Sequence, residues 1–177
     1  MTNFKEDILR VKAFVFDCDG VLTDCTVITL PSGEALRVYN AKDGFAVALA
    51  VKRGYKVCII SGGVGEAMQA RFERLEVSDI YLGCKEKLKA LNEFAAKYDL
   101  SMDDILYMGD DVPDVEPMMA VGVAAAPKDA AIEVKQMAKY ISNLDGGKGC
   151  VRDVIEQVLR AQKKWAQIGS ERDIMSI

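Results

Sequence analysis

The sequence feature that most constrains the fold is a short apolar run that ends abruptly in two carboxylates. Residues 11–16 are rich in Val and Phe and lack polar alternation, which predicts a strand buried on both faces. Asp17 and Asp19 follow at the carboxyl end of that strand, where open α/β sheets bind their ligands. Two carboxylates so close repel each other, which raises the pKa of one unless a cation separates them. The stretch therefore indicates Mg²⁺ or a shared proton.

The rest of the chain alternates strand-like and helix-like segments, which is typical of an α/β fold. Further buried strands are predicted at 55–60 and 105–108, and amphipathic helices at 45–53, 86–98 and 150–164. Such alternation predicts a doubly wound, mostly parallel sheet with helices on both faces. Because the chain has 177 residues and no linker, repeat or low-complexity segment, we expect residues 1–177 to form one domain.

Composition excludes several classes of function. The formal net charge of -4 argues against nucleic acid or an anionic membrane as a partner, and no apolar run is long enough to span a bilayer. The chain has no histidine, so histidine triads and imidazole bases are absent. Its 5 cysteines form no C-x-x-C pair, so neither a disulfide framework nor a zinc site is expected. The polar N-terminus is no signal peptide, and we expect a cytoplasmic protein.

Four polar clusters follow the predicted strands and are expected to converge on one crevice, because the carboxyl ends of parallel strands share a sheet edge. They are Asp17 with Asp19, Ser61, Lys87, and Asp110 with Asp111 and Asp114. Together they predict a phosphoryl-transfer site in which the Asp17 carboxylate attacks phosphorus. Lys87 and Ser61 would stabilise the phosphoryl charge, and Mg²⁺ would screen the attacking carboxylate. Without histidine, a carboxylate must move the proton, and Asp19 is placed for that role.

These residues resemble the four motifs of the haloacid dehalogenase superfamily of phosphatases. The resemblance is carried by Asp17-Cys18-Asp19-Gly20-Val21-Leu22-Thr23-Asp24, Ser61, Lys87 and Gly109-Asp110-Asp111-Val112-Pro113-Asp114. It implies that Asp17 is the nucleophile, that Asp19 is the general acid and base, and that Ser61, Gly62 and Lys87 bind the phosphoryl group. It also implies Mg²⁺ on Asp17, Asp110 and the carbonyl of Asp19. The roles of Asp111 and Asp114 stay open between a metal ligand through water, a partner of Lys87 and a helix cap.

No cap domain is expected, because only a helix and a strand separate Ser61 from Lys87 and only a β-hairpin fits at about 25–40. The chain thus resembles the capless branch of the superfamily. That branch implies a homotetramer with hairpin-mediated contacts. It also implies that the Gly-rich stretch 146–149 and the tail at about 165–177 lie near a neighbour's active site. Lys148 or Arg152 would then meet the carboxylate of a sugar acid.

The resemblance implies a small-molecule substrate, a phosphorylated keto-deoxy sugar acid of lipopolysaccharide biosynthesis, most closely 3-deoxy-D-manno-octulosonate 8-phosphate. Gly63 offers no side chain where related phosphatases often carry a charged residue. A nine-carbon keto-deoxy sugar acid 9-phosphate therefore stays the close alternative. A different class, a receiver-type phosphoacceptor domain, shares the sheet, the acidic cluster, Mg²⁺ and a Lys. Asp19 favours the phosphatase, because a receiver needs no acid for a leaving group.

Overall fold

A parallel sheet forms the centre of the molecule, which is described by a computed structural model over residues 3–165. The six strands stand in the order β5-β4-β1-β6-β7-β8, and every paired neighbour in the sheet is parallel. They are β1 (Ala13–Phe16), β4 (Lys56–Ile60), β5 (Asp79–Tyr81), β6 (Ile105–Met108), β7 (Val123–Ala126) and β8 (Tyr140–Ile141). The predicted α/β fold with a doubly wound parallel sheet is confirmed.

Strand β1 lies in the middle of this sheet and is buried on both faces, as its unbroken apolar run predicts. All four of its residues are inaccessible to solvent. Phe16, its last residue, pairs with Ile59 of β4 and Met108 of β6. This register brings the residues that follow β1, β4 and β6 to the same edge of the sheet.

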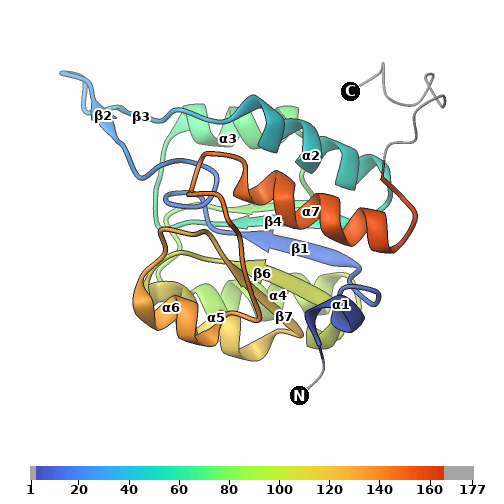
Figure 1. Ribbon diagram of the computed structural model, residues 1–177. Helices are drawn as coiled ribbons and strands as arrows, with labels where there is room; N and C mark the ends of the chain where they lie inside the picture. The colour runs from blue at the N-terminus through green and yellow to red at the C-terminus, as the bar shows by residue number, and fades with distance from the viewer. Residues whose placement is uncertain (1–2, 166–177) are drawn as a thin grey trace.

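Helices cover both faces of the sheet (Figure 1). One face packs against α2 (Ala41–Lys52), α3 (Glu66–Arg74) and α7 (Cys150–Ala161) through a core that includes Phe14, Phe16 and Phe72. The other face packs against α4 (Lys87–Lys97), α5 (Val115–Ala120) and α6 (Ile132–Met137) through a core that includes Val15 and Phe94.

Several element boundaries differ from the sequence-based predictions. Helix α2 begins at Ala41, one turn before the predicted start at Phe45, because the side chain of Asn40 caps it by accepting a hydrogen bond from the backbone N–H of Lys42. Helix α7 ends at Ala161 rather than at Lys164. Two short helices, α1 (Phe4–Asp7) and α5, were not predicted, since a helix of four to six residues shows too little periodicity to be read.

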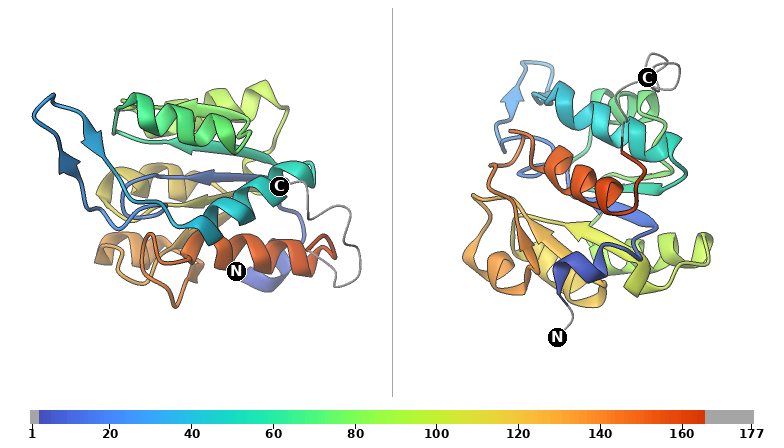
Figure 2. Two further views of the ribbon diagram at one scale, coloured as in Figure 1. Left: turned by 90° about the horizontal axis from the view of Figure 1, so that it is seen from above. Right: turned by 45° about the vertical axis from the view of Figure 1, so that its right-hand side comes forward.

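The only insertion between the first motif and α2 is the β-hairpin of β2 (Ile28–Thr29) and β3 (Ala35–Leu36), whose strands are shorter than the stretch at 25–40 suggests. Figures 1 and 2 show it projecting beyond the sheet. Between Ser61 and Lys87 the chain forms only α3 and β5, so the predicted absence of a cap domain is confirmed.

Two sequence-based predictions concern the C-terminal tail and the extent of the domain. The tail predicted at about 165–177 lies, apart from Trp165, outside the described residues. That residues 1–177 form one domain stays a prediction. Among the helices of residues 3–165, none is long and apolar enough to cross a membrane.

Candidate active site

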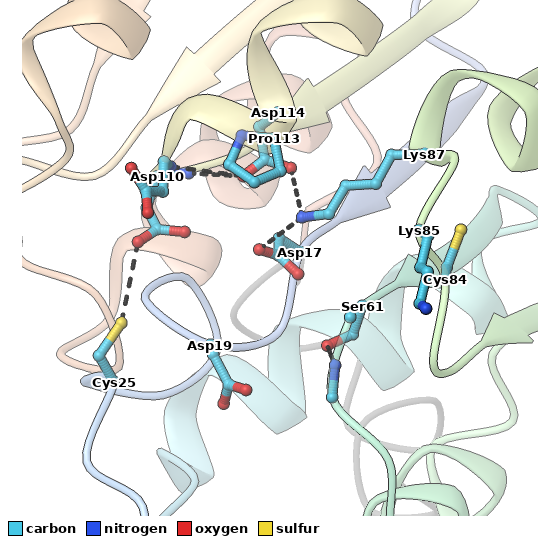
Figure 3. Close-up of a pocket in the computed structure, with 13 residues that line it drawn as sticks. Asp17, Asp19, Cys25, Ser61, Cys84, Lys85, Lys87, Asp110, Pro113 and Asp114 are labelled. Atoms are coloured by element: carbon cyan, nitrogen blue, oxygen red, sulfur yellow. Dashed lines mark hydrogen bonds and ion pairs between the residues drawn. The ribbon is translucent and has the colours of Figure 1, made fainter.

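A cavity of about 440 Å³ opens where the strands end, and it brings together the residues that the sequence places there (Figure 3). Asp17 and Asp19 follow β1, Ser61 follows β4, Lys87 begins α4, and Asp110 follows β6. The cavity is also lined by Cys25, Gly62, Gly63, Cys84, Lys85, Asp111, Pro113 and Asp114. Side chains far apart in the sequence thus face one space.

Lys87 lies at the centre of the most buried part of this cavity. Its Nζ is 2.8 Å from Asp17 Oδ2 and 2.8 Å from Asp114 Oδ1, and its side chain is only 7% exposed. The hydroxyl of Tyr107 donates a further hydrogen bond to Asp114 Oδ1 at 2.7 Å. One ammonium group therefore pairs with two buried carboxylates and compensates only part of their charge.

Asp114 is a partner of Lys87, and both of its carboxylate oxygens are engaged in hydrogen bonds. Its Oδ1 accepts from Lys87 and Tyr107, and its Oδ2 accepts from the backbone N–H groups of Asp110 and Asp111 at 3.2 and 3.4 Å. These bonds occupy the acceptor sites of the carboxylate. Asp111 caps the turn in front of α5 by accepting from Val112 N, which supports a capping role for that residue.

The electrostatics of the cavity favour a bound cation. Burial, with the negative charge of Asp114 added, raises the pKa of Asp17 to about 7, although Lys87 acts in the opposite direction. Burial also raises the pKa of Asp110 to about 7, together with the charges of Asp17 and Asp114. Two carboxyl groups are thus hard to ionise together unless positive charge is added between them.

The geometry around Asp110 fits Mg²⁺. Asp17, Asp110 and Asp114 each place a carboxylate oxygen within 4.8 Å of the others. Asp110 Oδ1 is buried and has no hydrogen-bond partner among the described residues, so one hard oxygen ligand is unused. The carboxylate of Asp110 lies against Gly20, where the Cβ of any other residue would overlap it. Since Asp114 is saturated, Asp17 and Asp110 are the side chains that fit the metal.

Ser61 and Gly62 form the wall next to Lys87. Ser61 is 1% exposed, and its Oγ accepts a hydrogen bond from the backbone N–H of Gly63 at 3.1 Å. That bond uses a lone pair of the hydroxyl and leaves its hydrogen able to donate into the cavity. Gly62 lines the cavity beside it. The two residues therefore stand where a phosphoryl oxygen would need donors.

Asp19 has a partner that the sequence did not reveal. The guanidinium of Arg37, which follows β3 of the hairpin, donates to both carboxylate oxygens, with Nε 2.6 Å from Oδ1 and Nη2 2.9 Å from Oδ2. Thr23 Oγ1 lies 3.2 Å from the same Oδ1. One signal was present in the sequence, because Arg37 is the charged residue in the otherwise apolar run from Ala35 to Tyr39.

Lys148 and Arg152 do not line this cavity within the described part of the chain. Lys148 Nζ is 2.9 Å from Asp24 Oδ2 on the surface, and the Arg152 guanidinium lies 5.3 Å from the ring centroid of Trp165 and pairs with Glu156. The loop before α7 packs on the loop after β1, since Gly147 N donates to the carbonyl oxygen of Val21 at 2.9 Å. A role for either basic residue in a neighbouring subunit stays a prediction.

Comparison with known proteins agrees with this geometry. Residues 74–152 match the model of a family described as haloacid dehalogenase-like hydrolase. The 3-deoxy-D-manno-octulosonate 8-phosphate phosphatase KdsC of Escherichia coli K12 is 31% identical over 155 residues, which cover 88% of this chain and 82% of the relative. The chain belongs to the haloacid dehalogenase-like hydrolases. The superfamily predicted from the four motifs is thereby confirmed.

Solved structures of haloacid dehalogenase-like hydrolases share the fold over almost the whole chain. The enzyme from Moraxella catarrhalis, described as a 3-deoxy-D-manno-octulosonate 8-phosphate phosphatase in complex with magnesium, phosphate and KDO, is 28% identical. It has a TM-score of 0.87 and covers 90% of this chain and 91% of its own. The cobalt-bound phosphatase from Haemophilus influenzae is 27% identical, with a TM-score of 0.89 and coverages of 96% and 99%.

Proposed function

We propose that this protein is a Mg²⁺-dependent phosphatase that hydrolyses 3-deoxy-D-manno-octulosonate 8-phosphate through an aspartyl phosphate. The observation that carries the proposal is the buried Lys87, held between Asp17 and Asp114 in a cavity that Ser61 also lines. This arrangement supplies a nucleophile, a cation and a donor within one space. The substrate class is supported by the named relatives, of which two bind magnesium or cobalt.

In the first step Asp17 attacks phosphorus, and the bond from phosphorus to the sugar oxygen breaks. Its Oδ1 accepts from the backbone N–H of Cys18 at 2.7 Å and its Oδ2 pairs with Lys87, so the carboxylate is held in one orientation. Lys87, Ser61 and Gly62 hold the phosphoryl group, while Asp19 gives a proton to the leaving sugar oxygen. Asp17 and Asp110 would hold Mg²⁺, which would screen the repulsion between the carboxylate and the phosphate.

In the second step water attacks the aspartyl phosphate, and the bond between phosphorus and Asp17 breaks. Asp19 accepts the proton of the water, which restores both carboxyl groups to their starting states and releases inorganic phosphate. A receiver-type domain would retain the phosphoryl group instead. Membership of a hydrolase family and the placement of Asp19 at the cavity both favour turnover.

A panel of phosphorylated sugar acids tests the substrate. We expect the highest kcat/KM with the eight-carbon 8-phosphate. A higher value for a nine-carbon keto-deoxy sugar acid 9-phosphate would replace the assignment. The nine-carbon alternative stays open because of Gly63. This residue adds no side chain to the cavity wall, so no side chain at position 63 selects between the two sugars. Equal and low values for all sugar acids would contradict the substrate class.

We also propose a cytoplasmic homotetramer, and the exposed surface of the hairpin supports the assembly. Val27, Ile28 and Val38 are 44%, 51% and 65% exposed, so the hairpin presents apolar surface that its own chain does not cover. Contacts between hairpins of neighbouring subunits would bury that surface and bring a neighbour's residues to each open cavity. Sedimentation equilibrium tests this, and a monomer at micromolar concentration would contradict it.

A further inference from the structure

The contact between Arg37 and Asp19 is unusual for a surface hairpin, because it is nearly buried and uses both oxygens of the carboxylate. The side chain of Arg37 is 6% exposed and that of Asp19 is 29% exposed. A third bond, from Arg37 Nη1 to the carbonyl oxygen of Ala35 at 3.2 Å, fixes the plane of the guanidinium. Paired N–H donors of this kind set the orientation of a carboxylate as well as its position.

The bonds around Asp19 leave one acceptor position open. A carboxylate offers about four lone-pair sites. Oδ1 accepts from Arg37 Nε and lies within reach of Thr23 Oγ1, whereas Oδ2 accepts only from Arg37 Nη2 among the described residues. The remaining site is therefore on Oδ2, the oxygen that would lie 3.1 Å from a Cβ at position 63. Asp19 and Gly63 both line the cavity, so the open site on Oδ2 lies at the cavity wall.

We propose that Arg37 is a positioning residue for Asp19, which it holds so that Oδ2 receives the proton of the water that hydrolyses the aspartyl phosphate. In that step the oxygen of water bonds to phosphorus, the bond from phosphorus to Asp17 breaks, and the proton moves to Oδ2. The paired N–H bonds fix the plane of the carboxylate, so the remaining lone pair of Oδ2 points in one direction. The inference rests on the two-step reaction proposed above, and it places a residue of the hairpin in control of the second step.

Gly63 is the second part of this arrangement. A Cβ at position 63 would lie 2.7 Å from Arg37 Nη2, closer than such atoms approach, and would have to displace the end of the Arg37 side chain. Because Gly63 has no side chain, the guanidinium of Arg37 can lie beside Asp19. Gly63→Ala shifts Arg37 without removing its charge and without removing the hairpin's link to the loop.

The test uses rapid-quench kinetics with p-nitrophenyl phosphate, whose good leaving group needs little help from an acid. For Arg37→Ala we expect the rate constant for hydrolysis of the aspartyl phosphate to fall about 10-fold or more, within the range of general-base contributions. The rate constant for its formation should change less than about 3-fold, because general-base help is confined to the hydrolysis step. Arg37→Lys, which keeps the charge but loses the paired donors, should fall between wild type and Arg37→Ala.

Gly63→Ala should also slow hydrolysis of the aspartyl phosphate while leaving its formation unchanged. It becomes the deciding variant if Arg37→Ala fails to fold. Glu34→Ala, at an exposed turn position of the same hairpin, is the matched control and should leave both rate constants unchanged. A parallel fall in both rate constants, or no change in either, would overturn the assignment of Arg37. Phosphate release by Asp17→Asn would overturn the proposed reaction instead, so the two failures are distinguishable.

Discussion

Two groups of charged residues in the molecule differ in how their charges are held. Lys87 with Asp17 and Asp114 is buried, joined by ion pairs and fixed further by Tyr107. Lys148 with Asp24 is a surface pair whose side chains are 60% and 34% exposed. Buried paired groups are pre-organised for chemistry, whereas exposed pairs contribute little to stability and exchange partners easily. The first group is thus held in one buried arrangement, whereas the second lies in contact with solvent.

The largest effect is expected from replacing the nucleophile of the buried group. Asp17→Asn should abolish Mg²⁺-dependent phosphate release, because an amide oxygen does not form the aspartyl phosphate. The assay is phosphate release from the sugar acid phosphate under saturating Mg²⁺. Asp24→Asn, an acidic residue of the surface pair, is the matched control and should keep most of the activity. Equal losses of activity in Asp17→Asn and Asp24→Asn would contradict the proposed difference between the buried group and the surface pair.

Lys87→Met should have the next largest effect. It leaves the carboxylates of Asp17 and Asp114 without their cation and removes a charge from the phosphoryl site. We expect kcat/KM to fall about 100-fold or more, as for the loss of one stabilising donor, with a lower Tm. Lys89→Met on the same helix, where the Lys89 side chain is 67% exposed, should change neither quantity. Retention of activity in Lys87→Met would show that the buried ion pairs are only structural.

The effect of Mg²⁺ on stability should depend on pH. The pKa values of Asp17 and Asp110 are raised from 3.8 to about 7, so the folded protein without metal binds more protons than the unfolded chain between these values. Its free energy of unfolding therefore falls as pH rises through that range. Mg²⁺ binds the ionised carboxylates, so the increase in Tm that it causes should be small near pH 5 and reach several degrees near pH 8.

Differential scanning calorimetry with and without Mg²⁺ measures this dependence. Asp110→Asn removes one ligand and should lose most of the increase at the higher pH. Asp103→Asn, an exposed carboxylate far from the cavity, is the control. A Tm increase of the same size at both pH values would contradict the involvement of these two carboxyl groups.

The smallest effect is expected at the surface pair. Lys148→Ala should leave Tm almost unchanged, because the pair with Asp24 is solvent-exposed. If Lys148 meets the substrate's carboxylate in a neighbouring subunit, KM for the sugar acid phosphate should rise about 10-fold. In that case the KM for p-nitrophenyl phosphate, which has no carboxylate, stays the same. An equal rise in both KM values would show that Lys148 does not recognise the carboxylate of the sugar.

Asp17, Asp110, Ser61 and Lys87 of the cavity could be predicted from sequence because each follows a strand. The apolar run before Asp17 and the one before Asp110 are local patterns, and parallel topology then brings their ends together. Such reasoning needs only the strand positions and not the details of packing.

The partners of these residues could not be predicted in the same way. Arg37 reaches Asp19 only because the hairpin leaves the sheet at a particular angle, which no local pattern encodes. In the sequence, Tyr107 looks like one more apolar residue of β6. Only the structure shows that its hydroxyl donates a hydrogen bond to Asp114. Lys148 and Arg152 were assigned from resemblance, and within this chain they are engaged with Asp24 and Glu156.

The most direct test of the central claim is the capture of a phosphoryl group on Asp17. In Asp19→Asn the water that should hydrolyse the intermediate has no carboxylate to accept its proton. After brief mixing with p-nitrophenyl phosphate, whose leaving group needs little help from an acid, and Mg²⁺, the reaction is quenched with acid. Mass spectrometry of the digested protein should then find close to one phosphoryl group per chain on the peptide that contains Asp17. An unmodified peptide, together with continued release of phosphate by this variant, would contradict the two-step reaction.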